Sequence, residues 1–127
     1  MNEREAERSP PKQNSLSATI STAAVQLLHN YTGRGPTKAK TTITDDFVAI
    51  VVADTLTGGE RKLVEHGRAE HVLALRHDYQ SMMHADLIAL VERQLDRKVI
   101  AFMSQNHIDP DLGVEMFVLE AADAVQS

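Results

Sequence analysis

Three cations and two glycines lie close together in the segment Thr32–Lys40, in a chain whose formal net charge is −5. Backbone N–H groups beside glycines can surround an anion. An arginine can bind a carboxylate or a phosphate through two parallel hydrogen bonds. We therefore predict an anion-binding loop with Arg34 as the bidentate anchor, lysines as added charge and glycines as backbone donors. Its predicted members are Gly33, Arg34, Gly35, Thr37, Lys38 and Lys40.

The same segment has a structural interpretation. Gly33 can take the left-handed conformation that ends a helix, and the basic residues after it can face the negative end of that helix. The segment is not a phosphate-binding P-loop, since that pattern needs a Gly-Lys pair after four intervening residues and a helix after the pair. The sequence alone leaves the anion loop and the helix cap as two open alternatives.

A second cluster of polar residues lies between two predicted strands. Its members are Asn106, His107, Asp109, Asp111 and Glu115. Histidine and carboxylates could bind a divalent cation or transfer protons. Asp-Pro-Asp is also common turn chemistry, because aspartate bonds its own backbone and proline restricts the chain. We therefore name a second candidate site here but predict neither a catalytic residue nor a metal ligand.

The remaining chemistry-bearing residues give weaker patterns. Of the six histidines, His77 and His84 are seven residues apart, so they share a helix face but are too distant to chelate as an i, i+4 pair would. The chain has no cysteine, which excludes disulfides and thiolate metal sites. It also lacks the Gly-x-Ser-x-Gly turn of serine hydrolases. We predict no cofactor.

The elements that must position these residues follow from apolar periodicity and turn residues. Residues 1–14 carry mixed charge without apolar periodicity and are predicted to be a disordered tail. We predict that residues 15–122 form one domain and that residues 123–127 form a C-terminal tail. We predict helices over Ser15–Tyr31, Gly58–His66 and Arg68–Leu95, and strands over Lys40–Thr44, Phe47–Ala53, Val99–Gln105 and Val114–Glu120.

The long third helix has an apolar stripe that we expect to face the core. Its members are Val72, Leu75, Tyr79, Met82, Met83, Leu87, Leu90, Val91 and Leu95. The helix before it starts with Thr57-Gly58-Gly59-Glu60, which has the spacing of a capping box.

The order α-β-β-α-β-β predicts an α+β fold with a four-stranded, mainly antiparallel sheet and helices on one face. It also reads as one helix–hairpin unit used twice. The strand Phe47–Ala53 is apolar on both of its faces, which is typical of a sheet covered on both sides. Because the helices can cover only one face, we expect a homo-oligomer in which the other face is covered.

Composition narrows the function classes. The net negative charge argues against nucleic acid as a partner. The longest apolar run, Phe47–Ala53, is far shorter than the about 20 residues of a membrane-spanning helix, so we expect no membrane span. We expect a cytoplasmic protein, since the chain starts with polar, charged residues and contains no cysteine.

The residues also resemble a known family. The likeness lies in Tyr31–Lys40, in Leu56-Thr57 with Glu60, Leu63–Glu65 and Gly67-Arg68, and in Asn106–Asp111 with Glu115–Glu120. Together they resemble the bacterial MpsC family, labelled as part of a Na⁺-translocating membrane potential-generating system. Family members often have Thr-Gly-Arg before the third strand, where this chain has Leu95-Asp96-Arg97. Aspartate tolerates the left-handed conformation better than most residues, so the turn should survive.

The resemblance implies a small accessory or regulatory protein that serves a membrane ion-transport system. A membrane-protein partner and a location at the inner face of the membrane follow as expectations of the same kind. An anionic small molecule would be the ligand of the glycine loop. The alternative is a metal-dependent enzyme using His107, Asp109, Asp111 and Glu115, and a second alternative is a small nucleic-acid-binding domain.

Overall fold

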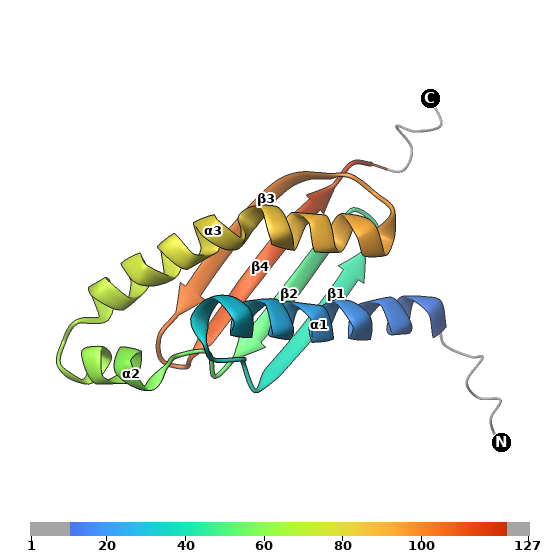
Figure 1. Ribbon diagram of the computed structural model, residues 1–127. Coiled ribbons are helices and arrows are strands. Elements are labelled where there is room, and N and C mark those ends of the chain that lie inside the picture. The colour runs from blue at the N-terminus through green and yellow to red at the C-terminus, as the bar shows by residue number, and fades with distance from the viewer. Residues whose placement is uncertain (1–10, 122–127) are drawn as a thin grey trace, which may run out of the picture.

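The computed structural model describes residues 11–121, which contain three helices and four strands (Figure 1). Along the chain they are α1 (Pro11–Thr32), β1 (Lys38–Thr44), β2 (Phe47–Ala53), α2 (Gly58–Glu65), α3 (Ala69–Leu95), β3 (Val99–His107) and β4 (Leu112–Leu119). Helix α1 begins inside the segment predicted to be a tail. The rest of that tail, residues 1–10, and the predicted C-terminal tail lie outside the described residues.

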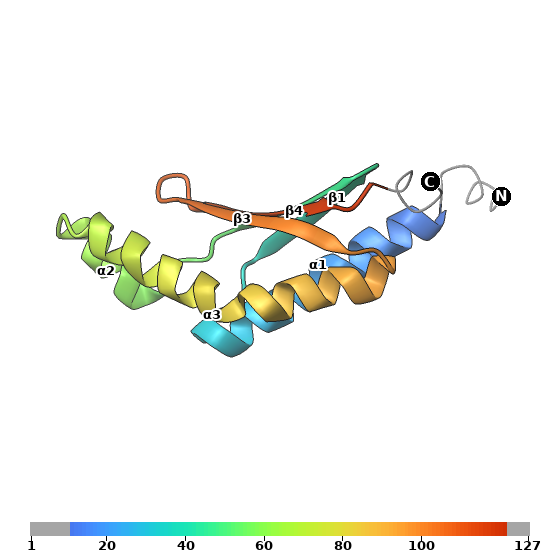
Figure 2. The same cartoon turned by 90° about the horizontal axis from the view of Figure 1, so that it is seen from above.

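The predicted α+β class is confirmed. The strands form one antiparallel sheet in the order β1-β2-β4-β3. Helices α1 and α3 lie on the same face of this sheet, and α2 lies beyond one end of the strands beside α3 (Figures 1 and 2). Within residues 11–121 no element covers the opposite face (Figure 2).

The local signals explain where the helices start and stop. Thr57 and Glu60 form the predicted capping box: the Glu60 N–H donates to the Thr57 hydroxyl oxygen, and the Thr57 N–H donates to the Glu60 carboxylate. Gly33 ends α1 at φ +79°. Asp96 ends α3 at φ 55°, so it takes the left-handed conformation expected of it. An Asp-Pro-Asp turn joins β3 to β4, as predicted.

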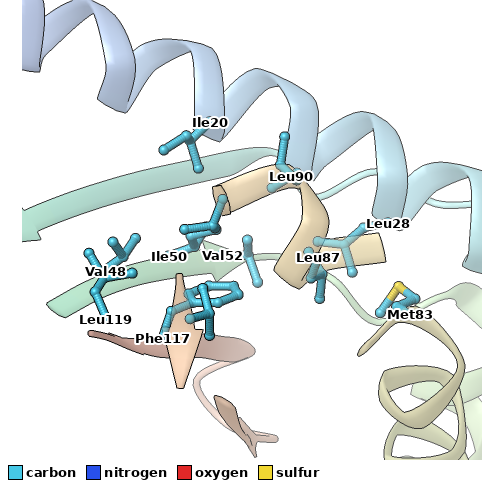
Figure 3. Packing of buried hydrophobic residues seen from close by; sticks show 13 residues of the cluster. Ile20, Leu28, Val48, Ile50, Val52, Met83, Leu87, Leu90, Phe117 and Leu119 are labelled. Carbon is cyan, nitrogen blue, oxygen red and sulfur yellow. The ribbon is translucent and has the colours of Figure 1, made fainter. Parts of the chain in front are cut away.

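The core is mainly aliphatic and lies between the two long helices and the sheet (Figure 3). Ile20 from α1, Met83 and Leu87 from α3, and Ile50 and Phe117 from the central strands are all at most 1% exposed. Burial of such side chains stabilises a fold by roughly 1.5–3 kcal/mol each. The apolar residues of β2 and β4 that face the helices therefore hold the two layers together.

The predicted inner stripe of α3 was wrong at two positions. Leu75 is 39% exposed and Met82 is 56% exposed. Successive helical residues are about 100° apart around the axis, so when Met83 points at the sheet, Met82 points sideways. The buried stripe instead includes Arg76 and Gln80, two polar residues at the four-residue spacing that follows Val72.

The two helix–hairpin halves are built alike. In each, a left-handed residue ends the helix and an arginine follows it. The Arg34 guanidinium donates to the carbonyl of Asp54, which directly follows β2. The Arg97 guanidinium donates to the carbonyl of Glu120, which directly follows β4. The second strand of each hairpin, β2 and β4, pairs with the other at the centre of the sheet.

Candidate functional site

The predicted anion loop begins with backbone groups that already have partners. The Gly33 N–H donates to the carbonyl of His29 at 2.8 Å. The Arg34 N–H donates to the Thr32 hydroxyl oxygen at 3.2 Å. The Thr37 N–H donates to the carbonyl of Ala53 at 3.1 Å. These three donors close α1 and start the β1–β2 ladder.

Arg34 is held by one carboxylate of its own chain. Its guanidinium lies 2.7 Å from the Asp54 carboxylate and also donates through Nε to the Asp54 carbonyl at 3.2 Å. Arg61 binds the other oxygen of the same carboxylate at 2.5 Å. The hydrogen bond from Arg34, with the two positive charges, holds the pKa of the Asp54 carboxyl below its ordinary value. Arg34 therefore holds the segment before β1 against the loop that follows β2.

Gly35 and the two lysines, which were predicted to act with Arg34, point to other parts of the structure. A Cβ added to Gly35 would lie 3.4–3.5 Å from side-chain atoms of Val25 and His29, so this glycine lies against α1. Lys38 and Lys40 are exposed and alternate with the half-buried Ala39 along β1. They therefore lie on the sheet face that the helices do not cover. The structure brings the two lysines together, away from the backbone groups of the glycine turn.

The second predicted cluster is also divided. Asp111 binds the loop after β2: its carboxylate accepts from the Thr55 hydroxyl and from the Leu56 N–H, both at 2.9 Å. His107 Nδ1 donates to the carbonyl of Pro110 at 2.8 Å. Asp109 is exposed. These residues shape the β3–β4 turn and attach it to the loop before α2.

Glu115 points away from that turn, toward the helices. It is 2% exposed and accepts a hydrogen bond from the Ser104 hydroxyl. Burial raises the pKa of the Glu115 carboxyl to about 7, although hydrogen bonds from Ser104 and Gln80 and the charge of Arg76 act in the opposite direction. A carboxyl with such a pKa exchanges its proton near neutral pH.

Glu115 belongs to a buried polar cluster that also contains two amide side chains and an ion pair. The Gln80 and Asn106 side chains exchange hydrogen bonds of 3.1 and 3.2 Å. Arg76 donates to the Glu60 carboxylate at 2.9 Å and to the Thr55 carbonyl at 2.5 Å. Both side chains of this ion pair are less than a tenth exposed. The cluster joins β3, β4, α2 and α3 at the end of the sheet where the aliphatic core stops.

Sequence reasoning missed Glu60, Arg76 and Gln80 as members of a site. The available signal was the spacing of Val72, Arg76, Gln80, Met83 and Leu87, which places two polar residues on a core stripe. Glu60 was recognised only as a cap. Its carboxylate caps α2 and pairs with Arg76 at the same time.

A shallow pocket of about 180 Å³ opens beside the cluster, between α3 and β3. Its lining residues are His77, Gln80, Ser81, His84, Phe102 and Ser104. The rings of His84 and Phe102 have centroids 4.8 Å apart. The two histidines predicted to share a helix face thus line one pocket.

The geometry does not favour a metal centre. In the described part of the chain, no group of three or more His, Asp or Glu side chains could hold a metal ion. The physical reason is strand alternation, which sends successive side chains to opposite faces. His107 is directed to the uncovered face, whereas Glu115 is buried under the helices. The metal-enzyme alternative therefore lacks a set of ligands that could meet at one ion, because His107 and Glu115 lie on opposite faces of the sheet.

The fold and these contacts define a small two-layer α+β protein in which Arg34, Arg76 and Asp111 bind other groups of the same chain. The chain belongs to the MpsC family, described as a Na⁺-translocating membrane potential-generating system, with residues 12–121 matched. The chain has no match among curated proteins or among solved structures. No helix in residues 11–121 is long and apolar enough to cross a membrane.

Proposed function

We propose that this protein is a non-catalytic accessory or regulatory subunit of a membrane potential-generating system, and that it acts by binding. Family membership over residues 12–121 supports the link to such a system. In this proposal the subunit lies in the cytoplasm, at the inner face of the membrane, and contacts a membrane-protein partner.

One observation carries the proposal of binding rather than catalysis. The side chains that could do chemistry are engaged in holding loops and helices together: Arg34 binds Asp54, Asp111 binds the backbone before α2, and Arg76 binds Glu60. An acid–base or nucleophilic site needs such groups directed at a substrate.

An anionic ligand remains part of the proposal, with fewer residues. Lys38 and Lys40 are exposed on β1 and lie two residues apart on one face, so both ammonium groups can approach one anion. Arg34 would have to leave Asp54 before it could join them. Lys38 and Lys40 are therefore the residues that we propose to contact the anion.

The test is the membrane potential of cells from which the gene has been deleted, measured with a potential-sensitive dye. We expect the deletion to change the potential and the wild-type chain to restore it. The variant Asp109→Ala should restore it equally well, because Asp109 is exposed in the β3–β4 turn and would have no catalytic role.

Two results would contradict the proposal. An unchanged membrane potential in the deletion strain would separate this chain from any such system. If the folded Asp109→Ala variant fails to restore the potential, the cluster of His107, Asp109, Asp111 and Glu115 acts in the function and the enzyme alternative returns.

A further inference from the structure

The sheet has one face that α1 and α3 cover and one face that no element in residues 11–121 covers (Figure 2). Strand registers and the alternation of buried and exposed residues assign each side chain to a face. We call the uncovered side the outer face. It consists of the side chains that alternate with the core residues Val48, Ile50 and Phe117.

The centre of the outer face is apolar. Its members on β2, β4 and β3 are Phe47, Ala49, Val51, Ala53, Leu112, Val114, Met116, Val118, Ala101 and Met103. Val51 is 43% exposed and Met103 is 46% exposed, although both lie within strands. Valine and methionine side chains that remain this exposed on a continuous sheet form a contiguous apolar surface rather than scattered residues.

The rim of the outer face is polar. Lys38, Lys40, Thr42 and Thr44 lie along the β1 edge, and Gln105 and His107 lie along the β3 edge. None of the strand positions on this face is an aspartate or a glutamate. An apolar centre with a polar rim is the usual anatomy of a protein–protein interface.

We propose that a second copy of this chain covers the outer face, sheet against sheet, about a twofold axis that runs along the strands between β2 and β4. This inference goes beyond the proposed function and does not depend on it. Lys38 and Lys40 lie on the edge strand β1, at the solvent-accessible rim of the interface, where an anion still reaches their ammonium groups. In the dimer the two helical layers lie outside, and two sheets form a common core between them.

The size of the face approaches that of a specific dimer interface. Four strands about 4.8 Å apart and seven residues rising about 3.3 Å each give a flat footprint of about 440 Å² per copy. Side-chain relief makes the accessible area larger than the footprint, so the two copies bury more than about 880 Å² in total. This exceeds the about 800 Å² of most crystal contacts and approaches the about 1,200–2,000 Å² of specific complexes.

Charge selects the orientation of the axis. A twofold axis along the strands places β1 of one copy over β3 of its partner, so Lys40 lies over Gln105 and Val51 lies over Val114. An axis across the strands would place β1 over β1 and gather four lysines of two copies at one edge. The four ammonium groups would repel one another, most strongly where the apolar surface excludes water.

A lipid surface fits this face less well than a second copy does. Segments that lie in a membrane interface are rich in Lys and Arg and insert Trp, Phe or Leu. The strands of the outer face supply two lysines and, of these apolar types, Phe47 and Leu112. A flat surface made mainly of valine, alanine and methionine matches another surface of the same kind.

The first experiment measures the mass of the full chain by analytical ultracentrifugation across a range of micromolar concentrations. We expect a dimer for the wild type and at least about tenfold weaker association for Val51→Lys, because the variant would bury an unpaired charge in the interface. Met103→Lys is a second variant on the outer face. Leu73→Lys is the matched control, since Leu73 is 39% exposed on α3.

A cross-linking experiment tests the axis. The chain has no cysteine, so Lys40→Cys and Gln105→Cys each introduce a single reactive thiol. With a short bismaleimide, we expect dimers to be cross-linked when the two variants are mixed and exchanged, and not in Lys40→Cys alone. Cross-linking of Lys40→Cys alone would overturn the proposed orientation.

Three results would overturn the dimer itself. One is a wild-type monomer at all concentrations, and another is a dimer that Val51→Lys and Met103→Lys leave intact while both remain folded by circular dichroism. The third is a wild-type monomer that sediments with anionic lipid vesicles, together with a Val51→Lys variant that does not. That pair of results would identify the outer face as a membrane-binding surface. None of these results depends on the membrane potential of cells.

Discussion

Glu115→Gln is the most informative single substitution, because the buried Glu115 carboxyl combines a raised pKa with few exposed atoms. The side chain is 2% exposed and its pKa is raised to about 7 by burial. Glutamine keeps the size of the side chain and can still bond Ser104 and Gln80, but it cannot ionise.

The direction in which stability changes with pH follows from proton binding by Glu115. The folded protein holds the Glu115 proton up to a pH of about 7, whereas the unfolded chain releases it near 4.5. Between these values the folded state binds more protons, so the free energy of unfolding falls as the pH rises. At about 1.4 kcal/mol for each pH unit, the loss from this carboxyl between pH 5 and pH 8 is roughly 2.5 kcal/mol.

The assay is urea unfolding followed by far-ultraviolet circular dichroism at fixed protein concentration, at pH 5 and at pH 8. We expect Glu115→Gln to gain stability relative to the wild type as the pH rises, by roughly 2.5 kcal/mol across this interval. Glu65→Gln, on the exposed side of α2, should follow the wild type at both pH values. Equal pH dependence of the wild type and Glu115→Gln would refute the account of the buried carboxyl.

Three further variants test the ion pairs and the loops. Asp111→Asn should lower the free energy of unfolding by about 1–3 kcal/mol, because one carboxylate oxygen no longer accepts its hydrogen bond. Arg76→Met should cost about 3–5 kcal/mol by leaving Glu60 buried and unpaired, and the added change Glu60→Gln should recover part of the loss in urea unfolding. Lys38→Gln with Lys40→Gln should abolish calorimetric binding of inorganic phosphate while leaving stability within about 0.5 kcal/mol.

Local patterns in the sequence were sufficient for the elements and their order. Strand Phe47–Ala53 was predicted with its exact bounds, since a run of β-branched and apolar residues between two turns has few alternatives. The capping box at Thr57 and the left-handed turn at Asp96 are also confirmed. Each of these depends on residues within one or two turns of chain.

The candidate sites were less predictable because a side chain's partner can come from anywhere in the chain. Arg34 was predicted to bind an anion, and the carboxylate nearest to it belongs to Asp54. Asp111 and Glu115 are four residues apart, yet one binds the loop before α2 and the other lies under α3. Spacing along the chain cannot distinguish such partners from a ligand.

The sequence by itself determined the α+β class, the element order and the presence of a strand that is apolar on both faces. Those properties follow from periodicity and turn chemistry, which are local. Only the tertiary structure decided that Arg76 and Gln80 are buried, that Glu115 is held where its pKa rises, and that one sheet face is left uncovered by residues 11–121. These are consequences of which surfaces meet when distant segments pack, and burial and electrostatics depend on those meetings rather than on neighbours in the chain.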